Sequence, residues 1–123
     1  MKKQMFIVDC GTYPFDVLVC VGIDYDDMIT FLSKRCTLTD EEKEALIMSG
    51  GGRSVILKTG QSVLQVTLAK NKPFFHGNLA HEIFHIVDFL FERVGIKYSD
   101  DFNEAYAYQV QYLTEEIYKK LKV

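Results

Sequence analysis

Two histidines and two carboxylates interrupt an otherwise apolar stretch, residues 79–91: they are His81, Glu82, His85 and Asp88. In a helix of 3.6 residues per turn, His81 and His85 are about one turn apart, and they project side by side with Cβ atoms roughly 5–6 Å apart. Glu82 is turned sideways by about 100° from His81. Neutral imidazoles are common ligands of divalent metals, whereas unpaired burial of such polar groups costs several kcal/mol. The spacing therefore predicts that His81 and His85 bind one metal ion.

The order of these residues is the motif HExxH, in which two histidines bind zinc and the glutamate activates a water molecule. Zinc is accordingly the expected cofactor, and Glu82 is the expected general base. The alternative is structural, with two core histidines satisfied by main-chain carbonyls and carboxylates. The apolar surroundings of the motif favour the metal.

A catalytic zinc takes three protein ligands and keeps one position open, so another segment must supply a third ligand. Glu104, 19 positions after His85 and early in the next expected helix, is the first candidate. Asp101-x-x-Glu104 is equally a capping box, so spacing alone leaves both roles open for Glu104. Asp88 is better placed to orient an imidazole from outside the ligand set than to complete a tetrahedron.

Residues 81–85, followed by Asn103-Glu104-Ala105, resemble the gluzincins, the thermolysin-like HExxH zinc metallopeptidases. The resemblance covers about the last third of the chain, which in size looks like minimal gluzincins, including small ones of phage and prophage origin. It implies a zinc-dependent peptidase with Glu82 as base and a metal site formed by His81, His85 and Glu104.

The chain departs from the larger gluzincins at one supporting position. Those enzymes have an aspartate four residues after the ligand glutamate, where this chain has Tyr108. We therefore expect Asp88 to take over the support of a histidine. By analogy with zincins in general, an extended peptide substrate adds to the strand before the active helix, here residues 62–69 or a neighbouring strand.

Stabilisation of the oxyanion requires a hydrogen-bond donor near the metal. Tyr108 lies one turn from Glu104 on the same helical face, and it is our choice. The other candidate donors are His76, Tyr98 and Tyr106. Each of these side chains, and Tyr108 as well, can instead pack in a helix interface with its polar atom at the rim.

Two further functions compete with the peptidase. Peptide deformylases combine an upstream cysteine with HExxH, which makes Cys36 an alternative ligand in a deformylase-like metal amidohydrolase. A catalytically silent metal-binding or scaffold domain is the other alternative, and a closed fourth coordination position would favour it.

Patterning predicts an α+β domain with the order ββααββαα, in which a mixed or antiparallel sheet packs on the HExxH helix and a C-terminal helix. Thr39 and Glu42 form a capping box, and the glycines 50–52 read as a flexible turn. Gly95 is expected to end the HExxH helix. The expected strands are 5–9, 15–21, 54–58 and 62–69, and the expected helices run through 24–36, from 39 to about 49, through 73–94, and from 99 or 101 onward.

Composition narrows the class of protein. The chain has 123 residues, 48% hydrophobic and 25% charged, with a net charge of −3. These values indicate one domain, residues 1–123, and argue against nucleic-acid and membrane binding. Three cysteines without metal or redox spacing, and no signal peptide, favour a cytoplasmic protein. A peptide or protein is the expected partner, and the sequence specifies neither its identity nor an oligomeric state.

Overall fold

The computed structural model describes residues 1–123 as four strands and four α-helices, which confirms the α+β class. The strands and helices follow one another in the expected order, with one additional turn of 3-10 helix before the last helix. The elements are β1 (Gln4–Cys10), β2 (Tyr13–Val21), α1 (Tyr25–Arg35), α2 (Asp40–Ala45), β3 (Gly52–Ile56), β4 (Ser62–Val66), α3 (Phe75–Arg93), η1 (Asp100–Phe102) and α4 (Asn103–Lys120).

The strands form one mixed sheet in the order β1-β2-β4-β3. The hairpins β1–β2 and β3–β4 are antiparallel, and β2 and β4 pair in parallel at the centre. β4 is therefore bonded to a strand on each side, so of the two expected alternatives, residues 62–69 or a neighbouring strand, only the neighbour still offers an edge to a substrate. The edge strand nearest to α3 is β3, whose main chain pairs only with β4.

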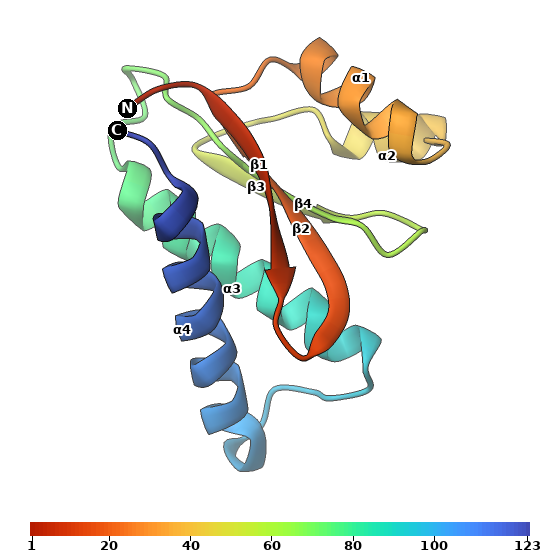
Figure 1. The fold of residues 1–123 in the computed structure, drawn as a ribbon, viewed down its shortest axis with the longest axis vertical. Coiled ribbons are helices and arrows are strands. Elements are labelled where there is room, and N and C mark those ends of the chain that lie inside the picture. Colours follow the sequence, from red (N-terminus) through yellow and green to blue (C-terminus); the bar gives the residue numbers. More distant parts are fainter.

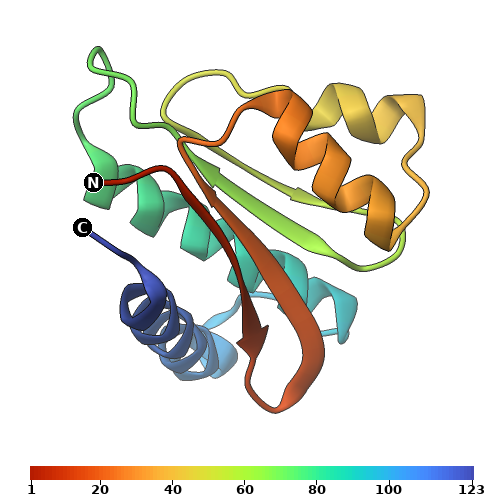
Figure 2. The same ribbon diagram turned by 45° about the horizontal axis from the view of Figure 1, so that its top comes forward.

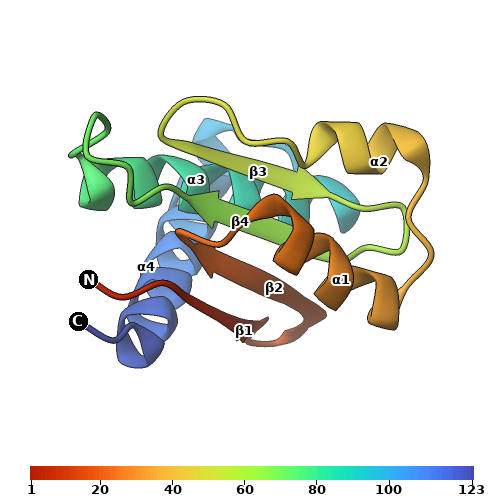
Figure 3. The same ribbon diagram turned by 90° about the horizontal axis from the view of Figure 1, so that it is seen from above.

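Helices cover both faces of the sheet, as Figures 2 and 3 show. Along β2, Val17, Val19 and Val21 pack toward α3 and α4, whereas Leu18 and Cys20 pack toward α1 and α2. This alternation follows from the two-residue period of a strand. No helix has both the length and the apolar composition needed to cross a membrane.

Strand β4 is buried on both faces. It alternates polar and apolar residues, yet all five of them are buried. Gln65 remains satisfied because its amide Nε2 donates a 2.9 Å hydrogen bond to the carbonyl oxygen of Leu46, at the end of α2. A polar side chain in a strand therefore did not mark exposure here.

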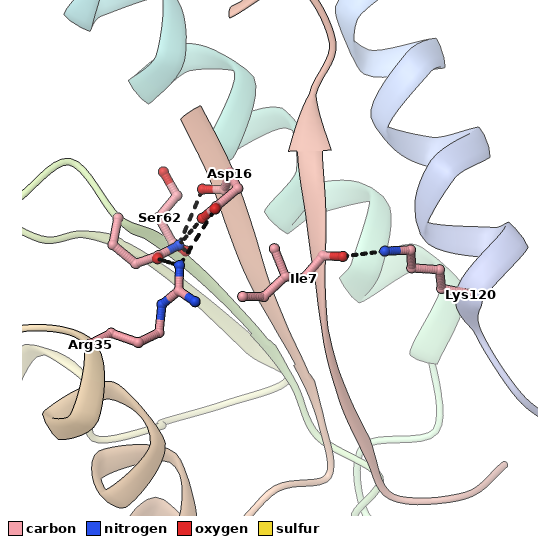
Figure 4. A network of polar contacts seen from close by, with 6 residues as sticks. Ile7, Asp16, Arg35, Ser62 and Lys120 are labelled. Atoms are coloured by element: carbon pink, nitrogen blue, oxygen red, sulfur yellow. Dashed lines mark hydrogen bonds and ion pairs between the residues drawn. The ribbon is translucent and has the colours of Figure 1, made fainter. Parts of the chain in front are cut away.

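The two edge strands of the sheet differ in how far other parts of the chain cover them. At β1, the ammonium of Lys120 from α4 donates to the carbonyl of Ile7 (Figure 4). The side chain of Gln4 also bonds to the main chain of Lys122, which brings the two termini together (Figure 1). No hydrogen bond or helix of this kind closes the outer edge of β3.

The end of α3 is set by Gly95, as expected. Gly95 has φ +83°, and its N–H donates to the carbonyl of Glu92 while the N–H of Ile96 donates to that of Phe91. These two bonds form a Schellman motif, which glycine favours because it lacks a Cβ. The chain then turns back, so that Tyr106 of α4 packs edge-on against Phe91 at 4.6 Å between ring centroids.

Glu42 links α2 to the turn after β3. The capping box is confirmed: the N–H of Glu42 donates to Thr39 Oγ1 at 3.1 Å, and that of Thr39 donates to Glu42 Oε1 at 3.0 Å. Oε2 accepts from the N–H of Lys58 at 2.9 Å. The pKa of Glu42 is lowered by the hydrogen bonds from the main chain of Thr39, and then of Lys58, because both favour the ionised carboxylate.

We expect Glu42→Gln to lower the free energy of unfolding by about 1 kcal/mol at neutral pH, because one main-chain donor loses its acceptor. A lowered folded-state pKa contributes stability above the ordinary glutamate pKa, and this stability is lost as the pH falls through the lowered value. The difference between wild type and variant should therefore shrink in acid, measured by urea unfolding. Glu41→Gln, on the same turn but exposed, is the control, and a difference independent of pH would contradict the assignment.

Candidate functional site

The two imidazoles of α3 converge. The Nε2 atoms of His81 and His85 are 3.0 Å apart, and their ring centroids are 4.8 Å apart. Two nitrogens bound at 2.0–2.1 Å to one tetrahedral zinc would be about 3.3 Å apart. The observed spacing therefore fits two ligands of the same metal ion after a small outward movement of the rings.

Glu82 faces the sheet rather than solvent and is only 6% exposed. Its Oε1 accepts a hydrogen bond from Ser54 Oγ on β3 at 2.8 Å. Its Oε2 accepts no hydrogen bond from the chain, yet no buried side-chain oxygen lacks a partner, so Oε2 retains contact with solvent. One oxygen of the carboxylate is thus fixed and the other is open, which is the arrangement that a general base needs.

Gly52 allows α3 to approach β3 at this point. A Cβ on Gly52 would lie 2.8 Å from Glu82 Cγ and 3.0 Å from the carbonyl oxygen of Gln65. The glycines 50–52 were expected to form a flexible turn, but Gly52 begins β3 and packs against the helix. Glycine inside a strand often marks such a close approach.

Sequence reasoning missed Gly52 and Ser54 as parts of the site. A usable signal was present, because residues two apart in a strand share a face, so a glycine and a hydroxyl at this spacing point to the same neighbour. Nothing in the sequence identified that neighbour as Glu82, which lies 28 positions after Ser54.

These residues line an open hollow of about 410 Å³ between β3 and α3. It combines the two imidazoles with the carboxylate of Glu82, and it opens beside the unpaired edge of β3. Its lining residues are Gly52, Arg53, Ser54, His81, Glu82, His85 and Phe89. We call this hollow the histidine groove.

Glu104 lies outside the histidine groove. It stands in the first turn of α4, where its side chain is exposed and forms no hydrogen bond or ion pair. The capping-box alternative is wrong, because Phe102 occupies the N-cap position and no side chain caps this helix. No three His, Cys, Asp or Glu side chains are grouped to hold a metal ion, so the third ligand is not assembled beside the imidazoles.

Asp88 contacts α4 instead of an imidazole. Its Oδ1 accepts a hydrogen bond from the hydroxyl of Tyr106 at 3.3 Å, and no hydrogen bond joins it to His81 or His85. Burial raises the pKa of Tyr106, and the negative charge of Asp88 raises it further. The contact holds the first turns of α4 beside the middle of α3.

The other oxyanion candidates are spread over the molecule. Tyr108 is 66% exposed and lines a hollow near the β1–β2 turn, away from the histidine groove. His76 bonds through Nδ1 to the hydroxyl of Tyr118 at 2.6 Å. Tyr98 packs against the rings of Phe84 and Tyr106. The structure therefore brings none of these donors into the groove.

Cys36 lies on the opposite side of the sheet from the imidazoles. It packs with the cluster formed by α1 and α2, whereas α3 packs on the other face. It lines a hollow of about 480 Å³ with Gln61, Arg35 and Asp16, and Figure 4 labels the last two. Deformylase-like ligation would require Cys36 to lie close to the histidines, but the sheet separates them.

All three cysteines are free thiols, and burial raises the pKa of Cys10 and Cys20 to about 12.

The chain matches no protein-family model, no curated protein and no solved structure.

We expect Tyr106→Phe to lower the free energy of unfolding by about 1 kcal/mol, because Asp88 loses the one donor that the chain offers it. The exposed Tyr108→Phe should stay within about 0.5 kcal/mol of wild type. Thermal and urea unfolding of both variants measure these effects. Equal destabilisation by the two substitutions would show that the Tyr106 hydroxyl does not support α4 through Asp88.

Proposed function

We propose that the protein is a zinc-dependent peptidase of the minimal gluzincin type, which hydrolyses a peptide bond with Glu82 as general base. One observation supports this function above the others: two converging imidazole nitrogens line the same hollow as a carboxylate whose second oxygen accepts no hydrogen bond from the chain. A pair of histidines that only filled a core would be sealed in it, but His81 is exposed and His85 is half-buried.

In the proposed site, His81, His85 and Glu104 hold the zinc. The imidazole pair fits the metal in spacing and donor type, whereas Glu104 must turn toward it from the first turn of α4. The Glu104 side chain has no partner to give up in doing so. When bound, zinc supplies a Lewis acid that activates water and polarises a substrate carbonyl.

The chain's own contribution is the proton transfer. Glu82 takes a proton from the attacking water through Oε2, because Oε1 is engaged by Ser54. Glu82 lies on α3 together with the two imidazoles, so one rigid helix sets the relative positions of the proton acceptor and the metal ligands. Tyr108 remains our proposed oxyanion donor, and it too must move toward the groove.

The substrate is proposed to be a peptide in extended conformation that adds to β3. This strand borders the histidine groove and has an unpaired outer edge, so main-chain hydrogen bonds to it would align a peptide beside Glu82. Of the two expected alternatives, residues 62–69 and a neighbouring strand, we propose the neighbour, because both edges of β4 are paired.

Purified protein should bind about one equivalent of zinc, and both His81→Ala and His85→Ala should abolish this binding, because each removes a ligand. Glu82→Gln should keep the metal and lose peptide hydrolysis, because the amide cannot accept the proton. Calorimetric zinc titration and cleavage of a fluorogenic peptide library measure the two effects. Zinc binding without any cleavage by the wild type would favour the catalytically silent domain, and no zinc binding would leave only a polar cluster.

Glu104→Ala should weaken zinc binding by more than about 100-fold, beyond the effect expected of a residue that only supports a ligand. Asp101→Ala, three positions earlier and equally exposed, is the matched control and should bind zinc as the wild type does. The same calorimetric titration compares the variants. Full zinc affinity in Glu104→Ala would transfer the role of third ligand to another group.

A further inference from the structure

We propose that strand β3 is the element that orients the Glu82 carboxylate, with Ser54 and Gly52 as positioning residues. Ser54 fixes Oε1, and the missing side chain of Gly52 leaves the space in which Oε2 lies. This role rests on the proposed function, in which Glu82 is the base, and it adds two residues that the HExxH motif does not contain.

The comparison of two buried glutamates supports this role. Glu42 and Glu82 are 8% and 6% exposed. Glu42 uses both carboxylate oxygens, which accept from the main chain of Thr39 and of Lys58, as a structural carboxylate is expected to do. Glu82 uses only Oε1, so the contact with Ser54 leaves the chemistry of the other oxygen available.

Ser54 makes a double contact with Glu82. Its hydroxyl lies 2.8 Å from Oε1 and 3.1 Å from the main-chain carbonyl oxygen of the same residue. The hydroxyl therefore ties the end of the side chain to a fixed point on the helix. A glutamate side chain has several rotatable bonds, and one contact at its end removes most of the freedom that would carry the carboxylate away.

Gly52 acts by leaving space. A Cβ at this position would lie 2.8 Å from Glu82 Cγ and 3.1 Å from Oε2. It would also lie 3.0 Å from the carbonyl oxygen of Gln65 in the neighbouring strand, which cannot yield easily. The side chain of Glu82 would thus be the group that moves.

Gly51 provides a matched control on the same segment. A Cβ there would meet the side chain of Asn78, at 2.3 Å from its amide nitrogen. Asn78 lies one turn before Glu82 on α3, and its amide is the end of a half-buried side chain that can turn away. Gly51→Ala therefore adds a methyl group between the same helix and strand without touching the carboxylate.

The experiment compares Ser54→Ala, Ser54→Thr, Gly52→Ala and Gly51→Ala with wild type. Crystal structures of the metal-free proteins give the conformation of Glu82, and calorimetry gives zinc affinity. Turnover is measured on the peptide that the wild type cleaves fastest in a fluorogenic library. Ser54→Ala and Gly52→Ala should displace the carboxylate and lower kcat about tenfold to a hundredfold, with KM and zinc affinity unchanged.

Ser54→Thr keeps the hydroxyl and should restore kcat, whereas Gly51→Ala should leave kcat and the Glu82 conformation as in wild type. The role of β3 is overturned if Glu82 keeps its conformation in Ser54→Ala and Gly52→Ala, or if Gly51→Ala loses as much kcat as Gly52→Ala. A wild type that neither binds zinc nor cleaves peptide overturns the proposed function instead. The crystal structures alone then decide whether β3 orients Glu82.

Discussion

The carboxylate of Glu82 lies between α3 and the edge strand β3, and the rest of the site depends on how it is held there. Taking an ionised glutamate out of water costs several kcal/mol unless hydrogen bonds or a cation compensate it. At Glu82 the compensation is one hydroxyl, from Ser54, and residual contact of Oε2 with solvent. The contact requires that β3 lie close against α3, and Gly52 makes this approach possible.

The layered fold supplies the rigidity that this contact needs. β2 and β4 are buried on both faces, so the centre of the sheet is fixed by packing against two pairs of helices. α3 spans the sheet and is held on its other side by α4, through the ring of Tyr106 against Phe91 and its hydroxyl on Asp88. Most apolar side chains of α3 are thereby buried, whereas His81 is left exposed and His85 half-buried.

Local features of the fold could be predicted from the sequence because their causes lie within a few residues. The capping box of Thr39 and Glu42, the helix end at Gly95, and the side-by-side imidazoles each depend on spacings of three to five residues. The contacts that complete the site are not local. Ser54 meets Glu82 and Gln65 meets Leu46 only because the sheet brings distant segments together. Strand order likewise depends on the whole chain, so the sequence could not decide between residues 62–69 and a neighbouring strand as the open edge.

Successive side chains of β3 point to opposite faces of the sheet and make different contacts. Gly52 and Ser54 face α3 and hold the carboxylate, whereas Arg53 faces the other layer and donates to the carbonyl of Ala45 at the end of α2. Side chains on both faces thus anchor the strand, and its main chain is left unpaired along the outer edge. Within the proposed function, a peptide bound to that edge would be aligned by the same strand that orients Glu82. The same strand would then position both the peptide and the general base, and catalysis by proximity depends on such fixed relative positions.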